Sequence, residues 1–212
     1  MEIIPIASYS VSILAGSILA AYFFREYFAK RLRASLAWAA GLLLYVLIQV
    51  FDLIVQFRGE AAAGKPILVA GFLMLAFAMS LLYYGTSLLF FSPGSFFREK
   101  MTAVIMFVYF VVIVAFSLEL PLEGFRAAVT PLVSIGVLFP IKVMIAALFY
   151  RVFRRLEVGD PRKQTVLLLA SGWGLDGLSA LLLWLIEPAS HAMHAIAWIM
   201  ILYGMTMGKV TK

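Results

Sequence analysis

The sequence predicts an all-α, polytopic integral membrane protein: one domain over residues 1–212 with seven transmembrane helices. Three observations support this prediction, since 64% of the 212 residues are hydrophobic, only 13% are charged and the mean hydropathy is +1.03. Soluble domains are about half apolar and about a quarter charged, whereas disordered chains are poor in hydrophobic residues. The composition therefore excludes both of these classes and indicates that lipid is the main solvent of the chain.

Seven apolar runs approach the length needed to cross a bilayer. A hydrocarbon core about 30 Å thick requires about 20 residues of α-helix. A backbone inside lipid must satisfy its own hydrogen bonds, and the runs lack the alternating pattern of barrel strands, so we expect helices. The expected spans are 5–24, 34–56, 67–91, 101–118, 132–152, 165–186 and 195–208.

The basic residues between the runs predict the orientation of the bundle. Thirteen of the 17 Lys and Arg residues fall in connections on one side, three fall on the other, and Lys142 lies within a span. Cytoplasmic loops of membrane proteins carry the excess of Lys and Arg. We therefore expect an external N-terminus, a cytoplasmic C-terminus and a multi-pass protein of the cell membrane. The net charge of +6 is then a topology signal and does not predict nucleic-acid binding.

The order of the spans also fits a parallel repeat, with two three-helix units joined by the fourth helix. Residues 31–41 and 162–172 share a basic start followed by small residues at the same offset, although such matches also arise by chance between membrane helices. This 3+1+3 order resembles the general plan of sugar-efflux and PQ-loop transporters, whose Pro-Gln signature is missing here. The resemblance implies transport at a midplane site. The order also resembles that of rhodopsins, but the seventh span has no lysine for a retinal Schiff base.

Two charged residues lie where lipid-facing helices avoid charge. Lys142 is about ten residues into the fifth span from outside and Asp176 about eleven into the sixth from inside, so both are about 15 Å deep. A charge at the bilayer centre costs about 2.5–3.5 kcal/mol, and such residues usually face the bundle interior and pair. We expect Lys142 and Asp176 to meet, either as a substrate, ion or proton site or as a static clamp.

Further polar residues are expected near the outer surface. Gln49, Asp52 and Gln56 share one helix face by their spacing of three and four. Together with Glu119 they predict an acidic mouth, which either concentrates cations or consists of ordinary solvated acids.

A second polar set surrounds the last predicted connection. Glu187, His191 and His194 are one helical turn apart, which is the spacing of a weak metal site or of polar residues in an exposed loop. We assign them to an exposed outer loop and predict no metal site.

A hydroxyl-rich set near the end of the third span comprises Tyr83, Tyr84, Thr86 and Ser87. It predicts either a polar cavity lining or contacts between helices.

These observations predict a small-solute or ion transporter or channel-like protein. The expected binding residues are Lys142, Asp176, Asp52, Gln49 and Tyr84. The alternative is a seven-helix receptor-like or assembly module that signals through a partner protein. The expected partners are the lipid bilayer, a small solute or ion, and a second copy or a partner membrane protein, with no cofactor. No Walker loop, dinucleotide-binding glycine fingerprint or serine elbow is present, so no enzyme activity is predicted.

Overall fold

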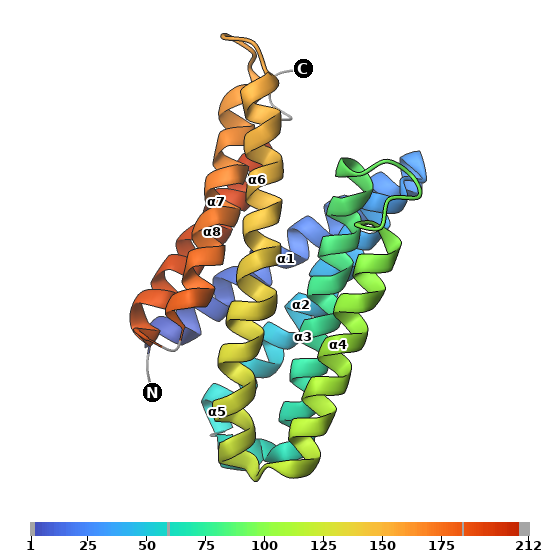
Figure 1. The fold of residues 1–212 in the computed structure, drawn as a ribbon. Helices are drawn as coiled ribbons and strands as arrows, with labels where there is room; N and C mark the ends of the chain where they lie inside the picture. Colours follow the sequence, from blue (N-terminus) through green and yellow to red (C-terminus); the bar gives the residue numbers. More distant parts are fainter. Residues whose placement is uncertain (1–2, 59, 184, 208–212) are drawn as a thin grey trace.

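A computed structural model describes residues 3–58, 60–183 and 185–207, and these are helical or in turns, with no strand (Figure 1). The prediction of an all-α chain is thereby confirmed for the described residues. A single continuous rod is formed by α5, a π-helical turn η1 and α6, so these residues contain seven helical rods. The elements are α1 (Ile3–Lys30), α2 (Arg33–Arg58), α3 (Glu60–Phe90), α4 (Glu99–Glu119), α5 (Leu122–Val133), η1 (Ser134–Leu138), α6 (Phe139–Arg155), α7 (Arg162–Leu182) and α8 (Glu187–Met207).

Six of these rods are long and apolar enough to cross a membrane, as judged over the described residues. They are α1, α2, α3 from Gly64, α4, the rod Leu122–Arg155 and α7. The rod α8 corresponds to the expected span 195–208, whose last residue lies outside the described part of the chain, and it is not among the six. It begins at Glu187 and contains two histidines, His191 and His194, in its first turns. The described chain has the helices of a multi-pass membrane protein.

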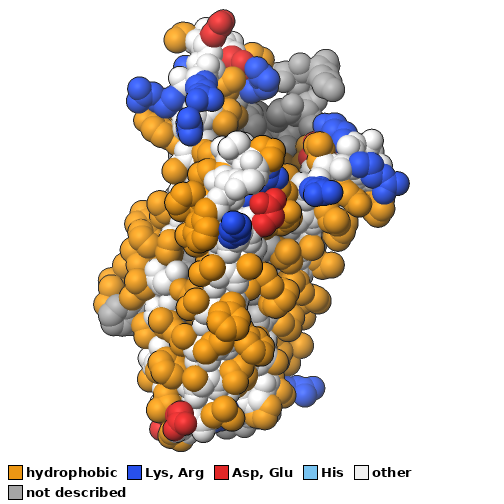
Figure 2. Space-filling view, turned by 45° about the vertical axis from the view of Figure 1, so that its right-hand side comes forward, with side chains coloured by type: hydrophobic (Ala, Val, Ile, Leu, Met, Phe, Trp, Pro, Cys, Tyr) orange, Lys and Arg blue, Asp and Glu red, His pale blue; other side chains and the backbone are white. Residues whose placement is uncertain are grey.

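The two ends of the bundle differ in charge. The connections α1–α2, α3–α4 and α6–α7 and the end of α8 all lie at one end, at the top of Figure 1. Most Lys and Arg side chains visible in Figure 2 gather at this end, and hydrophobic side chains cover the middle. We call it the basic end. The beginning of α1 lies at the opposite end, together with the adjoining ends of α2 and α3, of α4 and α5, and of α7 and α8.

The helices surround a common centre, with one rod at the edge. In the described structure α1 packs against α2 and α8, α2 against α3, α3 against α6, α6 against α7 and α7 against α8. Among the described residues, the rod α4 packs only against α3 and α5. In the most apolar 18-residue stretch of α4 only 11% is buried, whereas the corresponding stretches of the other five membrane-length helices are 33–50% buried. The outer face of α4 is therefore free to contact lipid or another protein, and the centre lies among the other rods.

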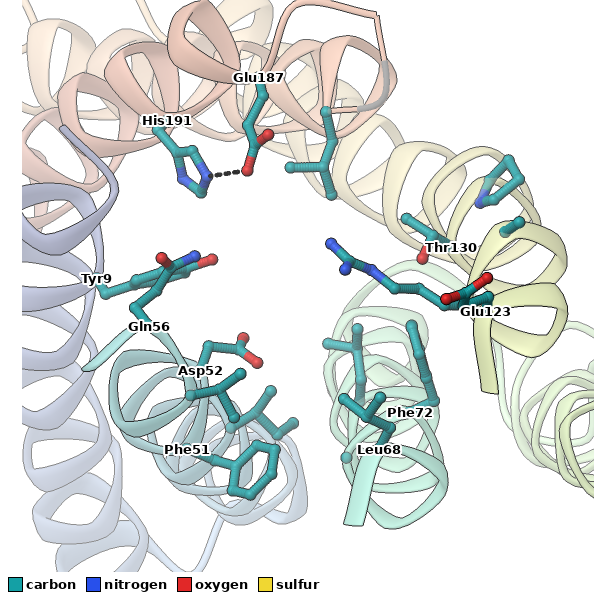
Figure 3. Close-up of a pocket in the computed structure, with 18 of the residues that line it drawn as sticks. Tyr9, Phe51, Asp52, Gln56, Leu68, Phe72, Glu123, Thr130, Glu187 and His191 are labelled. Atoms are coloured by element: carbon teal, nitrogen blue, oxygen red, sulfur yellow. Dashed lines mark ion pairs between the residues drawn. The ribbon is translucent and has the colours of Figure 1, made fainter. Parts of the chain in front are cut away.

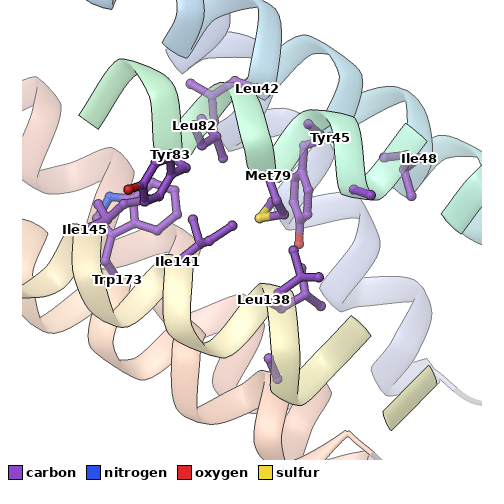
Figure 4. Packing of buried hydrophobic residues seen from close by; sticks show 14 of the residues in the cluster. Leu42, Tyr45, Ile48, Met79, Leu82, Tyr83, Leu138, Ile141, Ile145 and Trp173 are labelled. Carbon is purple, nitrogen blue, oxygen red and sulfur yellow. The ribbon is translucent and has the colours of Figure 1, made fainter. Parts of the chain in front are cut away.

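Close packing closes the bundle near the basic end. The Trp38 ring contacts the rings of Phe23, Phe149 and Trp173 at centroid distances of 5.4, 6.5 and 5.5 Å. These four residues form what we call the aromatic plug. A Cβ atom at Gly85 of α3 would overlap the Trp38 ring, so glycine there permits the close approach of α2 and α3. Figure 4 shows the apolar packing between the plug and the centre, including Leu42, Met79 and Ile141.

Candidate functional site

The structure brings together the two charged residues that the sequence places at mid-bundle. Lys142 of α6 and Asp176 of α7 form an ion pair, with Nζ and Oδ2 2.9 Å apart. Their side chains are 3% and 0% exposed. The π-helical turn η1 and Pro140 lie just before Lys142 on the same rod. Such π-turns are frequent at functional sites, and both π-turns and prolines are common causes of helix kinks.

A third residue, His194 of α8, completes this group. Its Nδ1 lies 2.6 Å from Oδ1 of Asp176, so the ring N–H donates to the carboxylate. Each oxygen of Asp176 thus has a charged or polar partner. We call Lys142, Asp176 and His194 the buried charge cluster.

The assignment of His191 and His194 to an exposed outer loop was wrong. Both residues are in α8, and they are only 4% and 8% exposed. The reason is that α8 starts at Glu187, since its backbone forms helical hydrogen bonds before the sequence becomes uniformly apolar. The spacing of Glu187, His191 and His194 was the available signal, because residues three and four apart share one helix face.

Neighbouring polar and aromatic groups hold the cluster in place. The Tyr45 hydroxyl on α2 lies 3.4 Å from Nε2 of His194, and the Lys142 ammonium lies 5.8 Å from the centroid of the Tyr45 ring. Ser179 donates to the backbone carbonyl of Asp176 one turn earlier at 2.8 Å. The Tyr45 ring stacks on Trp198 with centroids 5.3 Å apart. The cluster comes from α6, α7 and α8, and its contacts with Tyr45 link these three helices to α2.

A large cavity opens near the end of the bundle opposite the basic end. Its volume is about 830 Å³, and we call it the vestibule (Figure 3). In Figure 3, Tyr9, Asp52 and Gln56 lie on one side, Glu123 and Thr130 on the opposite side. Glu187 and His191 lie between these two sides, and their side chains are 3.7 Å apart. The polar lining residues are Tyr9, Asp52, Gln56, Glu123, Arg126, Thr130, Glu187 and His191.

A smaller pocket adjoins the vestibule and is also lined by two residues of the buried charge cluster. This inner pocket has a volume of about 110 Å³ and shares Tyr9, Asp52 and His191 with the vestibule lining. Lys142 and His194 of the cluster line it from the other side. A path of polar groups therefore leads from the vestibule towards Asp176, which is itself fully covered by its partners.

Of the other three predicted site residues, Gln49 and Asp52 line the inner pocket and Tyr84 does not. The Gln49 side-chain oxygen accepts a hydrogen bond from Ser12 at 2.9 Å. Tyr84 lines neither cavity, because it lies much closer to the basic end of α3 than Leu75, which does. The structure thus groups Lys142, Asp176, Gln49 and Asp52 and leaves Tyr84 apart.

The hydroxyl-rich set on α3 bonds to backbone carbonyls. Tyr83 donates to Phe97 O, Thr86 to Leu82 O and Ser87 to Tyr84 O, at 2.7–2.8 Å. Of the two interpretations of this set, a role in helix structure fits these contacts. For metals, the described residues contain no group of three or more His, Cys, Asp or Glu side chains that could hold an ion.

Comparison with protein-family models, with curated proteins and with solved structures found no match. The class is therefore set by the fold and the site alone. The described chain is an all-helical protein with six membrane-length helices, a buried charge cluster and a cavity that leads towards it.

Proposed function

We propose that the protein is a transporter of a small solute or ion across the cell membrane, with all seven rods spanning the bilayer. The basic end faces the cytoplasm, as the excess of Lys and Arg there favours. The vestibule then opens to the outside, and the structure corresponds to an outward-open conformation. The observation that supports this proposal most directly is the succession of vestibule, inner pocket and buried charge cluster.

The aromatic plug supports an outward-open conformation. Trp38 lies two turns from Tyr45 towards the basic end, and Phe149 lies two turns from Lys142 in the same direction. Trp38 and Trp173 are 4% and 1% exposed, so their rings are packed against their neighbours with almost no contact with solvent. Transport then requires these rings to separate while the vestibule closes. Rocking of α1–α3 against α6–α8, the two units of the proposed repeat, would achieve both changes.

The buried charge cluster is suited to respond to a solute. Lys142 and His194 line the inner pocket while they also bind Asp176. A solute that attracts either group weakens its contact with Asp176, which links α6, α7 and α8. Because a buried ion pair adds little net stability over apolar packing, a functional role explains its presence better than stabilisation does.

A flux assay in proteoliposomes tests this proposal. The probes are protons, followed with an internal pH dye, and labelled Na⁺, amines, amino acids and sugars. We expect the wild type to move at least one of them faster than empty liposomes, and Asp176→Asn or Lys142→Met to abolish that flux. Glu157→Gln and Lys100→Met make the same chemical changes on exposed side chains at the basic end and serve as matched controls. Absence of flux for every probe, or wild-type flux in both cluster variants, would refute the proposal.

The proposed orientation has its own test, because the chain contains no cysteine. Leu118, at the end opposite the basic end, is 78% exposed, and Val158 in the α6–α7 connection is 97% exposed. We expect a membrane-impermeant maleimide to label Leu118→Cys on intact cells and to label Val158→Cys only after permeabilisation. The opposite pattern would invert the orientation and place the vestibule in the cytoplasm.

The second candidate function is an assembly or receptor-like module that acts through a partner. The exposed face of α4 favours it, since Phe107 and Phe110 are 69% and 52% exposed and α4 packs only against α3 and α5 within the described structure. Purification in a mild detergent separates the two candidates. A partner present in a stoichiometric amount, together with no flux, would favour the module.

A further inference from the structure

We propose that the vestibule and inner pocket bind an organic ammonium ion, a protonated amine with an apolar body, and that Asp52 binds its charged group. This inference names the class of solute and so rests on the proposed function. It starts from a carboxylate that forms no ion pair with any residue that the structure describes.

Asp52 differs from Asp176 in having no partner within the described part of the chain. The Asp52 side chain is half-buried on α2, and its carboxylate points into the vestibule in Figure 3. It also lines the inner pocket, so it stands at the junction of the two cavities. Among the described residues, no ion pair and no hydrogen bond reaches this carboxylate, whereas both oxygens of Asp176 are occupied. A partly buried charge is costly unless it is paired, and a cationic ligand would supply the missing partner.

The charges around the cavities favour a cation over an anion. Three carboxylates, from Asp52, Glu123 and Glu187, line the vestibule together with one guanidinium, from Arg126. The inner pocket contains the Lys142 ammonium, but that charge is already bound to Asp176 at 2.9 Å. An anion would have to pass the Asp52 carboxylate to reach Lys142. A cation instead meets an unpaired carboxylate at the entrance to the inner pocket.

The shape and the apolar lining indicate an organic cation. A volume of about 830 Å³ is within the usual range for sites that bind small organic molecules, and most of the other lining residues are apolar. The rings of Tyr9, Phe51 and Phe72 are among the lining groups, and aromatic faces attract ammonium groups. The inner pocket, at about 110 Å³, is large enough only for the charged end. A bare metal ion fits less well, because the described residues contain no group of three metal-binding side chains.

Three probes of similar size and different charge test the inference by calorimetric titration of the protein in lipid nanodiscs. They are 2-phenylethylammonium, the neutral 2-phenylethanol and the anionic 3-phenylpropanoate. We expect the ammonium to bind at least about tenfold more tightly than the alcohol, since a hydrogen bond to a charged group is worth about 1.5–3 kcal/mol. We expect no measurable binding of the anion. Equal affinity for the ammonium and the alcohol, tighter binding of the anion, or no binding of the ammonium would overturn the inference.

Two variants locate the binding group. Asp52→Asn should raise the Kd of the ammonium by about tenfold or more and leave that of the alcohol unchanged. Glu123→Gln removes a carboxylate from the same vestibule away from the inner pocket and should change the Kd by less than about threefold. Because Asp52→Asn removes an unpaired charge, its Tm should equal or exceed that of the wild type, which a structural role would not allow. Wild-type affinity in Asp52→Asn would show that another group binds the cation and would overturn the assignment.

These titrations need no turnover, so they separate the binding site from the transport mechanism. Ammonium binding that depends on Asp52 supports the site even if proteoliposomes move none of the probes, a result that removes only the transport proposal. Flux of a sugar or an amino acid by a protein that binds no ammonium removes only the cation site.

Discussion

Replacing Asp176 by Asn should destabilise the bundle more than any other change in the buried charge cluster. The carboxylate is fully buried and binds Lys142 at 2.9 Å and His194 at 2.6 Å. The neutral amide of Asp176→Asn would leave the Lys142 ammonium buried without a counter-charge, with the Tyr45 ring centroid 5.8 Å away. Breaking a buried pair in this way costs about 3–5 kcal/mol. For a chain of this size, 1 kcal/mol corresponds to about 2–4 °C, so the Tm should fall by about 6–20 °C.

Removing the other partner should cost less. In Lys142→Met the carboxylate keeps the His194 ring N–H, 2.6 Å away, as a hydrogen-bond donor, so it is not left without a partner. We therefore expect a loss of about 3 kcal/mol or less, at the lower end of the range for broken buried pairs. The double variant Asp176→Asn/Lys142→Met contains neither charge. Its Tm should lie above that of Asp176→Asn alone, because a buried pair exchanged for neutral groups is often tolerated.

Thermal unfolding in nanodiscs, followed by the fluorescence of the buried tryptophans, measures these effects. Trp173 lies one turn from Asp176, and Trp198 one turn from His194, so both report on the cluster. Glu157→Gln and Lys100→Met on the surface should stay within about ±0.5 kcal/mol of the wild type. The reasoning would be refuted if the losses of the two single variants simply added in the double variant, or if Asp176→Asn melted at the wild-type temperature.

Two further predictions concern the plug and a helix start. Gly85→Ala should cost about 1–3 kcal/mol, because its Cβ would overlap the Trp38 ring, and Trp38→Leu in the same chain should restore part of the Tm; no recovery would argue against that overlap. Asp160 accepts hydrogen bonds from the Arg162 side chain and backbone N–H, which lower the pKa of Asp160 from 3.8 to about 2. Its stabilisation is complete above about pH 4 and is lost as the pH falls through about 2, so the Tm difference between wild type and Asp160→Asn should shrink over that interval in melts at stepped pH.

The sequence alone was sufficient to predict an all-helical chain and one contact of the site, that between Lys142 and Asp176. Long apolar runs fix helices in lipid, and a rise of about 1.5 Å per residue fixes depth, so the meeting of Lys142 with Asp176 followed from counting. His194 was missed because the spans were bounded by hydropathy, whereas a helix ends where its backbone hydrogen bonds end. A histidine can lie inside a helical bundle when a buried carboxylate is its partner. Its hydropathy value alone nevertheless counts against placing it in a membrane-spanning helix.

The cavities could not be predicted, since they depend on how several rods pack. Asp52 and Glu123 are far apart in the sequence and line the same vestibule. Tyr84 was expected among the binding residues, but spacing along one helix does not reveal which neighbouring helix covers which face. The hydroxyl groups around Tyr84 illustrate this point, because they bond to carbonyls of their own helix or of the α3–α4 connection.

Asp176 and Asp52 lie at different depths and have different roles in the proposed site. Asp176 is neutralised within the protein and joins three helices, so changing its contacts changes how α6, α7 and α8 fit together. Asp52 is open to the vestibule and has no partner among the described residues, so a ligand can bind it without first breaking an internal pair. A ligand held at Asp52 also borders the inner pocket, which Lys142 and His194 line. A ligand bound to Asp52 therefore lies next to Lys142 and His194, the two groups that bind Asp176. In the proposed mechanism, a ligand that changes these contacts also changes how α6, α7 and α8 pack.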